Sequence, residues 1–137
     1  MKKALSLLLA GAVLTTAGVA QARQQRTPEE QLSRITAGRT AGEPTDCIFL
    51  RDINSTEIIR NTAIVYRMNN GTIYVNQPNS GANFLDRDDI LVTDTHSPQL
   101  CSVDIVRLLD SGSRMTTGSV GLSKFVPYPR VRRSASN

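Results

Sequence analysis

Aromatic residues and histidine are scarce in this sequence, and each scarcity narrows the range of functions. The 137 residues include three phenylalanines, three tyrosines, no tryptophan, one histidine and two cysteines. So few cysteines and histidines cannot form the four-ligand cluster that holds structural zinc. No cofactor fingerprint and no known nucleophile motif is present either. We therefore expect no cofactor, no metal and no catalytic residue, and an enzyme is the less favoured interpretation.

Length and composition describe one folded domain. A chain of 137 residues fits one domain rather than two. With 39% hydrophobic and 20% charged residues, it matches neither a disordered tail nor a membrane-embedded protein.

The most apolar stretch is short and lies at the N-terminus. Two lysines precede an uncharged stretch of 15 residues, 4–18, and Ala20-Gln21-Ala22 then supplies the small-x-small pattern that signal peptidase recognises. A membrane-spanning helix needs about 20 apolar residues, which disfavours the alternative of a membrane anchor. We predict that residues 1–22 are a signal peptide cleaved between Ala22 and Arg23, with cleavage after Ala20 as the alternative.

Export implies a periplasmic or secreted protein that is not a transmembrane protein once processed, and it changes the charge. Removing residues 1–22 leaves 115 residues with 14 basic and 12 acidic side chains. A net charge of +2 gives little reason to expect a nucleic-acid partner. Lysine is scarce, because 13 of the 14 basic residues are arginine. The base composition of the genome explains that excess as well as any chemistry does.

Both cysteines, Cys47 and Cys101, survive this cleavage. An even number of cysteines in an exported domain predicts a disulfide. Closing a loop over a separation of 54 residues stabilises the folded state by about 4 kcal/mol in the chain-entropy account. Two free buried thiols are the alternative.

Residues 23–45 are predicted to form a short N-terminal helix and a linker. Thr27 can cap the helix, and Glu30 completes a capping box three residues later. Leu32 and Ile35 lie three apart and share one face. A helix of this length is not stable alone, so it must dock or be only partly formed.

From residue 46 to residue 128, short apolar runs separated by turn residues predict a mainly β domain. The fold is expected to be a small antiparallel barrel or, alternatively, a sandwich, with six or seven short strands. The expected strands are 48–50, 57–59, 63–68, 72–76, 90–93, 105–109 and 122–126.

Turn residues fix the clearest local feature of this domain. The alternating run 63–68 places Ile64, Tyr66 and Met68 on one face, and Asn70-Gly71 follows it, which is a strong hairpin signal. Residues 111–121 are small and predict a flexible loop. Residues 129–137 predict a flexible polar tail.

Three motifs resemble those of a family of small exported proteobacterial proteins classified only as a domain of unknown function. They are Asp-Cys-Ile at 46–48, Leu-Cys-x-x-Asp-Ile at 100–105 and Leu-x-x-Phe-Val-Pro-Tyr at 122–128. The resemblance covers residues 45–128. It implies a location in the bacterial envelope and no particular activity.

The resemblance also bears on the cysteines. Members of the family tend to carry four, and the other two would fall near residues 81–83 and at Val120, where this chain has none. Loss of both together is what loss of one disulfide would look like. The resemblance thus implies that Cys47 and Cys101 are partners.

Two clusters of polar residues are candidate sites, and each has a simpler structural interpretation. Asp94, His96 and Asp104 could supply a base and its orienting carboxylate, but no serine is placed within reach. His96 is then a loop residue, and Asp104 accepts backbone N–H bonds before a strand. The carboxylates at 86, 88 and 89 could bind calcium, although their spacing matches no EF-hand loop. A solvated turn is the simpler interpretation.

These observations favour an exported, non-enzymatic β domain that binds an envelope component or a protein partner of unknown identity. The alternative is a small periplasmic enzyme or ligand carrier with a site near Asp94, His96 and Asp104. A third hypothesis is an inhibitor of host lysozyme. A basic target requires an acidic surface, so the net charge of +2 counts against it.

The signal-peptide prediction is tested by N-terminal sequencing. When the full chain is expressed in a bacterium with a periplasm, the protein recovered from that compartment should begin at Arg23, because the small-x-small pattern ends at Ala22. Recovery of a membrane-bound form that retains Met1 would contradict export and release.

Overall fold

The structure, a computed structural model, describes residues 26–132. The predicted signal peptide, its cleavage site at Ala22 and Arg23, and the last part of the predicted tail lie outside the described residues. Within residues 26–132, no helix is long and apolar enough to cross a membrane.

Nine strands within the described part of the chain make the fold mainly β, as predicted. They are β1 (Cys47–Phe49), β2 (Ile53–Ile59), β3 (Ala63–Met68), β4 (Ile73–Asn76), β5 (Asp89–Thr93), β6 (Gln99–Cys101), β7 (Ile105–Asp110), β8 (Thr116–Gly121) and β9 (Phe125–Tyr128). One α-helix, α1 (Pro28–Ile35), and two short 3-10 helices, η1 (Leu50–Asp52) and η2 (Ala82–Phe84), accompany them.

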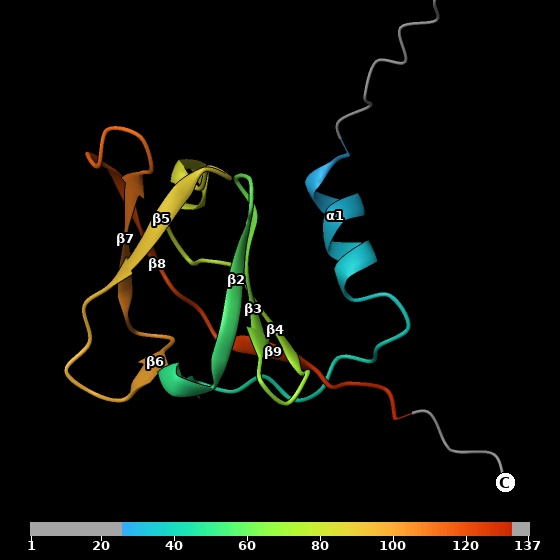
Figure 1. Ribbon diagram of the computed structural model, residues 1–137. Coiled ribbons are helices and arrows are strands. Elements are labelled where there is room, and N and C mark those ends of the chain that lie inside the picture. Colours follow the sequence, from blue (N-terminus) through green and yellow to red (C-terminus); the bar gives the residue numbers. More distant parts are fainter. Residues whose placement is uncertain (1–25, 133–137) are drawn as a thin grey trace, which may run out of the picture.

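The strands form three antiparallel sheets, in the orders β2-β3-β4-β9, β5-β7-β8 and β1-β6. The sheets are not closed into a barrel, so the barrel expectation is wrong. The two larger sheets instead face each other across a shared core, as in a sandwich, and α1 lies beyond the far face of the four-stranded sheet (Figure 1). Two of the nine strands, β6 and β8, were not predicted.

Strand β3 is buried on both faces. Ile64, Tyr66 and Met68 belong to the main core between the two larger sheets. Ala63 and Val65 belong to a second apolar cluster on the opposite face. The division of the strand into these two faces is the one that the sequence predicts.

Helix α1 docks on the second cluster and does not stand apart from the domain. Leu32 and Ile35 pack against the buried residues of the outer face of the sheet. The capping box is present, with the Glu30 N–H donating to Thr27 Oγ1 at 3.2 Å and the Thr27 N–H donating to the Glu30 carboxylate at 3.1 Å. The predicted helix is therefore confirmed, and docking supplies the stability that its length alone does not.

The predicted linker between the helix and the first strand is fastened to the sheet. The guanidinium of Arg39 donates to the carbonyl oxygens of Gly71 at 2.7 Å and Tyr128 at 3.0 Å. Gly42 N–H donates to Pro127 O at 2.8 Å. These bonds hold the linker beside β9. They therefore restrain the position of α1, which directly precedes the linker in the chain.

The β3–β4 hairpin is confirmed, with a three-residue loop. Gly71 has φ 85°, the left-handed conformation that glycine adopts without steric cost. The Met68 N–H donates to Thr72 O and the Gly71 N–H to Met68 O, both at 2.9 Å. Asn70 Oδ1 accepts from the Thr72 N–H at 2.9 Å, which gives that asparagine a local structural role.

The expectation of a flexible loop over residues 111–121 is wrong, because β8 occupies most of it and pairs with β7. The sequence hides this strand because Val120 is its only aliphatic residue. A Cβ atom at Gly118 would lie 2.6 Å from Cγ of Phe84. The small residue is thus required by the packing of Phe84 on the strand and does not signal flexibility.

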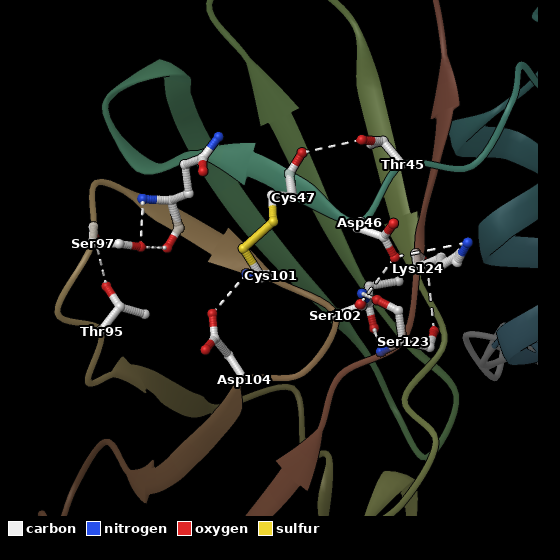
Figure 2. The surroundings of a disulfide bond; sticks show 12 residues. Thr45, Asp46, Cys47, Thr95, Ser97, Cys101, Ser102, Asp104, Ser123 and Lys124 are labelled. Carbon is white, nitrogen blue, oxygen red and sulfur yellow. Dashed lines mark hydrogen bonds and ion pairs between the residues drawn. A yellow bond between two sulfur atoms is a disulfide. The ribbon is translucent and has the colours of Figure 1, made fainter.

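The disulfide joins Cys47 and Cys101, which are direct register partners in the β1–β6 pair and have Cα atoms 4.0 Å apart. The alternative of two free thiols is therefore wrong. Figure 2 shows that Asp104 lies beside this bond, and its carboxylate accepts from the Cys101 N–H at 2.6 Å. Cys101 ends β6, so Asp104 acts in the turn before β7, as the structural interpretation of this residue predicts.

Removal of the disulfide should destabilise the domain strongly. In the chain-entropy account, Cys47→Ser and the double variant Cys47→Ser/Cys101→Ser should each lose about 4 kcal/mol of unfolding free energy, because either change removes the same cross-link. The measurement is urea denaturation of oxidised protein and of both variants. A single variant much less stable than the double variant would show that the remaining thiol has an effect of its own.

The main core contains one polar atom without a partner. The Tyr66 ring lies edge-on to Phe125 at 5.6 Å between centroids, and its hydroxyl oxygen has no hydrogen-bond partner among the described residues. Desolvation by burial raises the pKa of this phenol. The folded state therefore favours the neutral form, and stability should fall as pH rises through and above the ordinary tyrosine value of about 10.

Replacement of this phenol should be tolerated. Tyr66→Phe should raise the unfolding free energy by about 1 kcal/mol at neutral pH, because it removes an unsatisfied buried hydroxyl, and it should reduce the loss of stability at high pH. Urea denaturation at neutral and alkaline pH measures both effects, with Tyr74→Phe on the neighbouring strand as control. A loss of stability on Tyr66→Phe would show that the hydroxyl has a favourable partner.

Candidate functional site

An open groove of about 1280 Å³ lies on the described surface, and we call it the β2-edge groove. Three elements line it, namely α1 through Arg34 and Ile35, β2 through Thr56 and Ile58, and β5 through Ile90 and Leu91. In Figure 1, β2 lies between β5 on one side and α1 on the other. These elements are far apart in the sequence, and only the fold brings them together.

The groove exists because the two larger sheets do not join. β2 is an end strand of the four-stranded sheet and β5 an end strand of the three-stranded sheet. An end strand leaves the backbone groups of its outer side without a strand partner. The groove therefore has strand edge as its floor, with α1 and β5 as its walls.

The charges in the groove are predominantly positive. Four arginines line it, at positions 26, 34, 67 and 87, against the two carboxylates of Glu57 and Asp89. Arg67 is neutralised by Glu57, with an N–O distance of 2.8 Å. Within residues 26–132, the other three guanidiniums form no ion pair. With the Asp89 carboxylate counted against these three guanidiniums, the groove carries a net charge of +2.

Apolar side chains lie among these charges. Ile35 contributes from α1, Ile58 from β2, and Ile90 and Leu91 from β5. Ile90 is 39% exposed, so part of its side chain is accessible to a ligand in the groove. The groove can therefore contact both carboxylates and aliphatic side chains.

A second cavity of about 260 Å³ lies on the other side of α1, between the helix and strands β4 and β9. Its lining includes Leu32, Val75, Asn79 and Tyr128. The Asn79 amide already donates to Leu122 O at 2.9 Å. This smaller cavity offers few free polar groups, so the β2-edge groove is the stronger candidate.

The predicted acid–base cluster is not assembled in either of these cavities. Asp94 and His96 are exposed in the loop between β5 and β6. The Asp104 carboxylate is occupied by the Cys101 N–H. None of the three residues lines the β2-edge groove or the second cavity.

Two of the three carboxylates considered for calcium, those of Asp86 and Asp89, have other partners. Asp86 accepts from Arg60 at 2.9 Å, and this hydrogen bond, together with one from the Arg87 N–H, lowers the pKa of Asp86. Asp89 accepts from the Thr117 hydroxyl at 3.1 Å. In the described part of the chain, no group of three metal-ligating side chains converges.

Sequence reasoning did not find the arginines of the groove. The available signal was the excess of arginine over lysine, which base composition explains as well as chemistry does. No spacing pattern connects the four positions, because they come from α1 and its N-terminal flank, β3 and the residues before β5. Only their common location in the groove marks them as a set.

Comparison of the chain with protein-family models, with curated proteins and with solved structures finds no match. The resemblance to an exported family of unknown function therefore stays a prediction, and the geometry of the β2-edge groove is the basis for a functional conclusion.

Proposed function

We propose that this chain is a non-enzymatic binding protein of the bacterial envelope, periplasmic or secreted, that holds an acidic segment of a protein partner in the β2-edge groove. The disulfide supports an oxidising compartment. The signal-peptide pattern at residues 1–22 supports export. Both are consistent with the family resemblance.

The observation that carries the proposal is the set of three guanidiniums in the groove that form no ion pair within residues 26–132, those of Arg26, Arg34 and Arg87. Arginine binds carboxylates through short charge-assisted hydrogen bonds with two-pronged geometry. Charges facing one another across an interface steer association and fix which partner is accepted. An acidic ligand therefore fits this groove better than a neutral or basic one.

The alternative functions receive less support. An enzyme near Asp94, His96 and Asp104 would need these side chains in one pocket, and neither cavity contains them. A lysozyme inhibitor would have to present acidic groups to a basic enzyme. The β2-edge groove presents the opposite charge.

The arrangement of β8 supports the family resemblance. The segments in which the family would carry its second cysteine pair lie side by side, because Ser80 and Gly121 form an isolated bridge. Such proximity is what a disulfide between these segments requires.

Charge removal in the groove tests the proposal. Poly-L-glutamate should bind the oxidised protein at low ionic strength, and the triple variant Arg26→Gln/Arg34→Gln/Arg87→Gln should bind it about tenfold more weakly or worse, because three charge-assisted contacts are lost. Isothermal titration calorimetry at two salt concentrations measures the affinity and its screening.

The matched control is Arg107→Gln/Arg114→Gln/Arg132→Gln, which removes the same charge from exposed positions outside the groove. Its affinity should stay close to that of the unaltered protein. Equal losses in both variants would show that net charge alone drives binding. Tighter binding of polygalacturonate, a carboxylated glycan, would replace the protein partner by a polysaccharide.

A further inference from the structure

The floor of the β2-edge groove is a strand edge whose backbone direction is fixed by its neighbours. The Met68 N–H donates to Thr72 O, so the backbone groups of Met68 point toward the β4 side of β3. This direction alternates along a strand, which turns the groups of Arg67 and Val65 toward β2. Their register partners are Ser55 and Glu57.

The intervening residues of β2 consequently direct their backbone groups away from the sheet. These residues are Thr56 and Ile58, and both line the groove. Within residues 26–132, no backbone hydrogen bond joins either of them to a turn, a loop or a further strand. The bulge in β2 lies between Ile53 and Ser55, and from Ser55 to Ile59 the register is unbroken. About 17 Å of regular strand edge is therefore available.

The walls of the groove suit the alternating side chains of an added strand. On the α1 side, Arg34 and Ile35 line the groove together with Glu57 and Arg67. On the β5 side, Arg87 and Ile90 line the opposite wall. Successive side chains of an extended peptide point to opposite faces, so each wall would receive every second residue. Both walls combine a free guanidinium with an aliphatic group.

We propose that the partner binds by strand addition: an extended acidic segment of another protein pairs with β2 through the backbone of Thr56 and Ile58, and its carboxylates contact Arg34 and Arg87. This inference rests on the proposed function and specifies its mode of recognition. Main-chain hydrogen bonds supply affinity in such complexes, and the flanking walls supply specificity. A carboxylated glycan would satisfy the arginines but has no peptide backbone to pair with the strand.

The test uses a short blocked peptide of alternating Glu and Val, a copy of it with N-methyl groups on every internal residue so that both edges of the extended chain lose their donors, and poly-L-glutamate. N-methylation removes the donors that a paired strand needs and keeps every charge. The N-methylated copy should bind about tenfold more weakly or worse, because at least two backbone hydrogen bonds are lost. Amide exchange of Thr56 and Ile58, followed by NMR, should slow when the unmodified peptide is bound.

A variant of the protein removes a backbone donor of β2 itself, where the N-methylated peptide removes the donors of the ligand. Proline is tolerated at an edge position whose N–H faces outward, so Thr56→Pro should fold and bind the unmodified peptide about fivefold more weakly, while Thr56→Ala keeps the donor and full affinity. If Thr56→Pro does not fold, the N-methylated peptide on the unaltered protein decides the question.

The outcomes separate the two proposals. Binding that depends on Arg26, Arg34 and Arg87 but ignores N-methylation overturns strand addition and leaves the proposed function intact. Absence of binding by every peptide and by poly-L-glutamate overturns both. Self-association of the unaltered protein that Thr56→Pro abolishes also overturns the inference, because it assigns the β2 edge to a second copy of this chain.

Discussion

Every residue of strand β3 except Arg67 is buried, on both faces of the strand, and most of the architecture follows from that constraint. Ile64, Val65 and Ala63 are fully buried, although they alternate between the two faces of the strand. A strand that is apolar on both faces must be covered twice, because leaving either face in water forfeits the hydrophobic free energy of its side chains. The three-stranded sheet covers one face and α1 covers the other.

This double coverage explains why α1 and its tether belong to the folded unit. Leu32 and Ile35 would gain little hydrophobic free energy by packing on a polar surface. The second apolar cluster, on the outer face of the four-stranded sheet, gives them buried apolar side chains to contact. The helix is short and has no fully buried residue of its own. Its position therefore depends on the hydrogen bonds that the following linker makes. Arg39 donates to the carbonyl oxygens of Gly71 and Tyr128, and the Gly42 N–H donates to that of Pro127. This docking also makes α1 one wall of the β2-edge groove.

The same layering leaves the sandwich open at one side. The four-stranded sheet ends at β2 and the three-stranded sheet at β5, and no further strand of the described chain joins them. The disulfide joins β1 to β6 within the separate two-stranded sheet, and the Asp104 carboxylate accepts from the Cys101 N–H beside it. The polar segment Asn54–Glu57 and the bulge of β2 keep this open edge from being an apolar aggregation surface. The edge that remains is regular from Ser55 to Ile59, and Arg34 and Arg87 flank it.

The sequence by itself determined the local features: the capping box of α1, the two faces of β3, the turn at Gly71, the role of Asp104 and the bond between the only two cysteines. Each of these features depends on residues close in sequence. The cysteines are the exception, but a chain with only two of them allows only one intramolecular pairing. The tertiary structure decided the rest. Strand β8 was not predicted because it forms through contacts distant in sequence. Gly118 packs against Phe84 and the strand pairs with β7, and the local residue pattern contains neither partner. The open sandwich and the arginines of its groove depend on which sheet edges face each other, and hydrophobic periodicity records only whether a residue is buried, not what buries it.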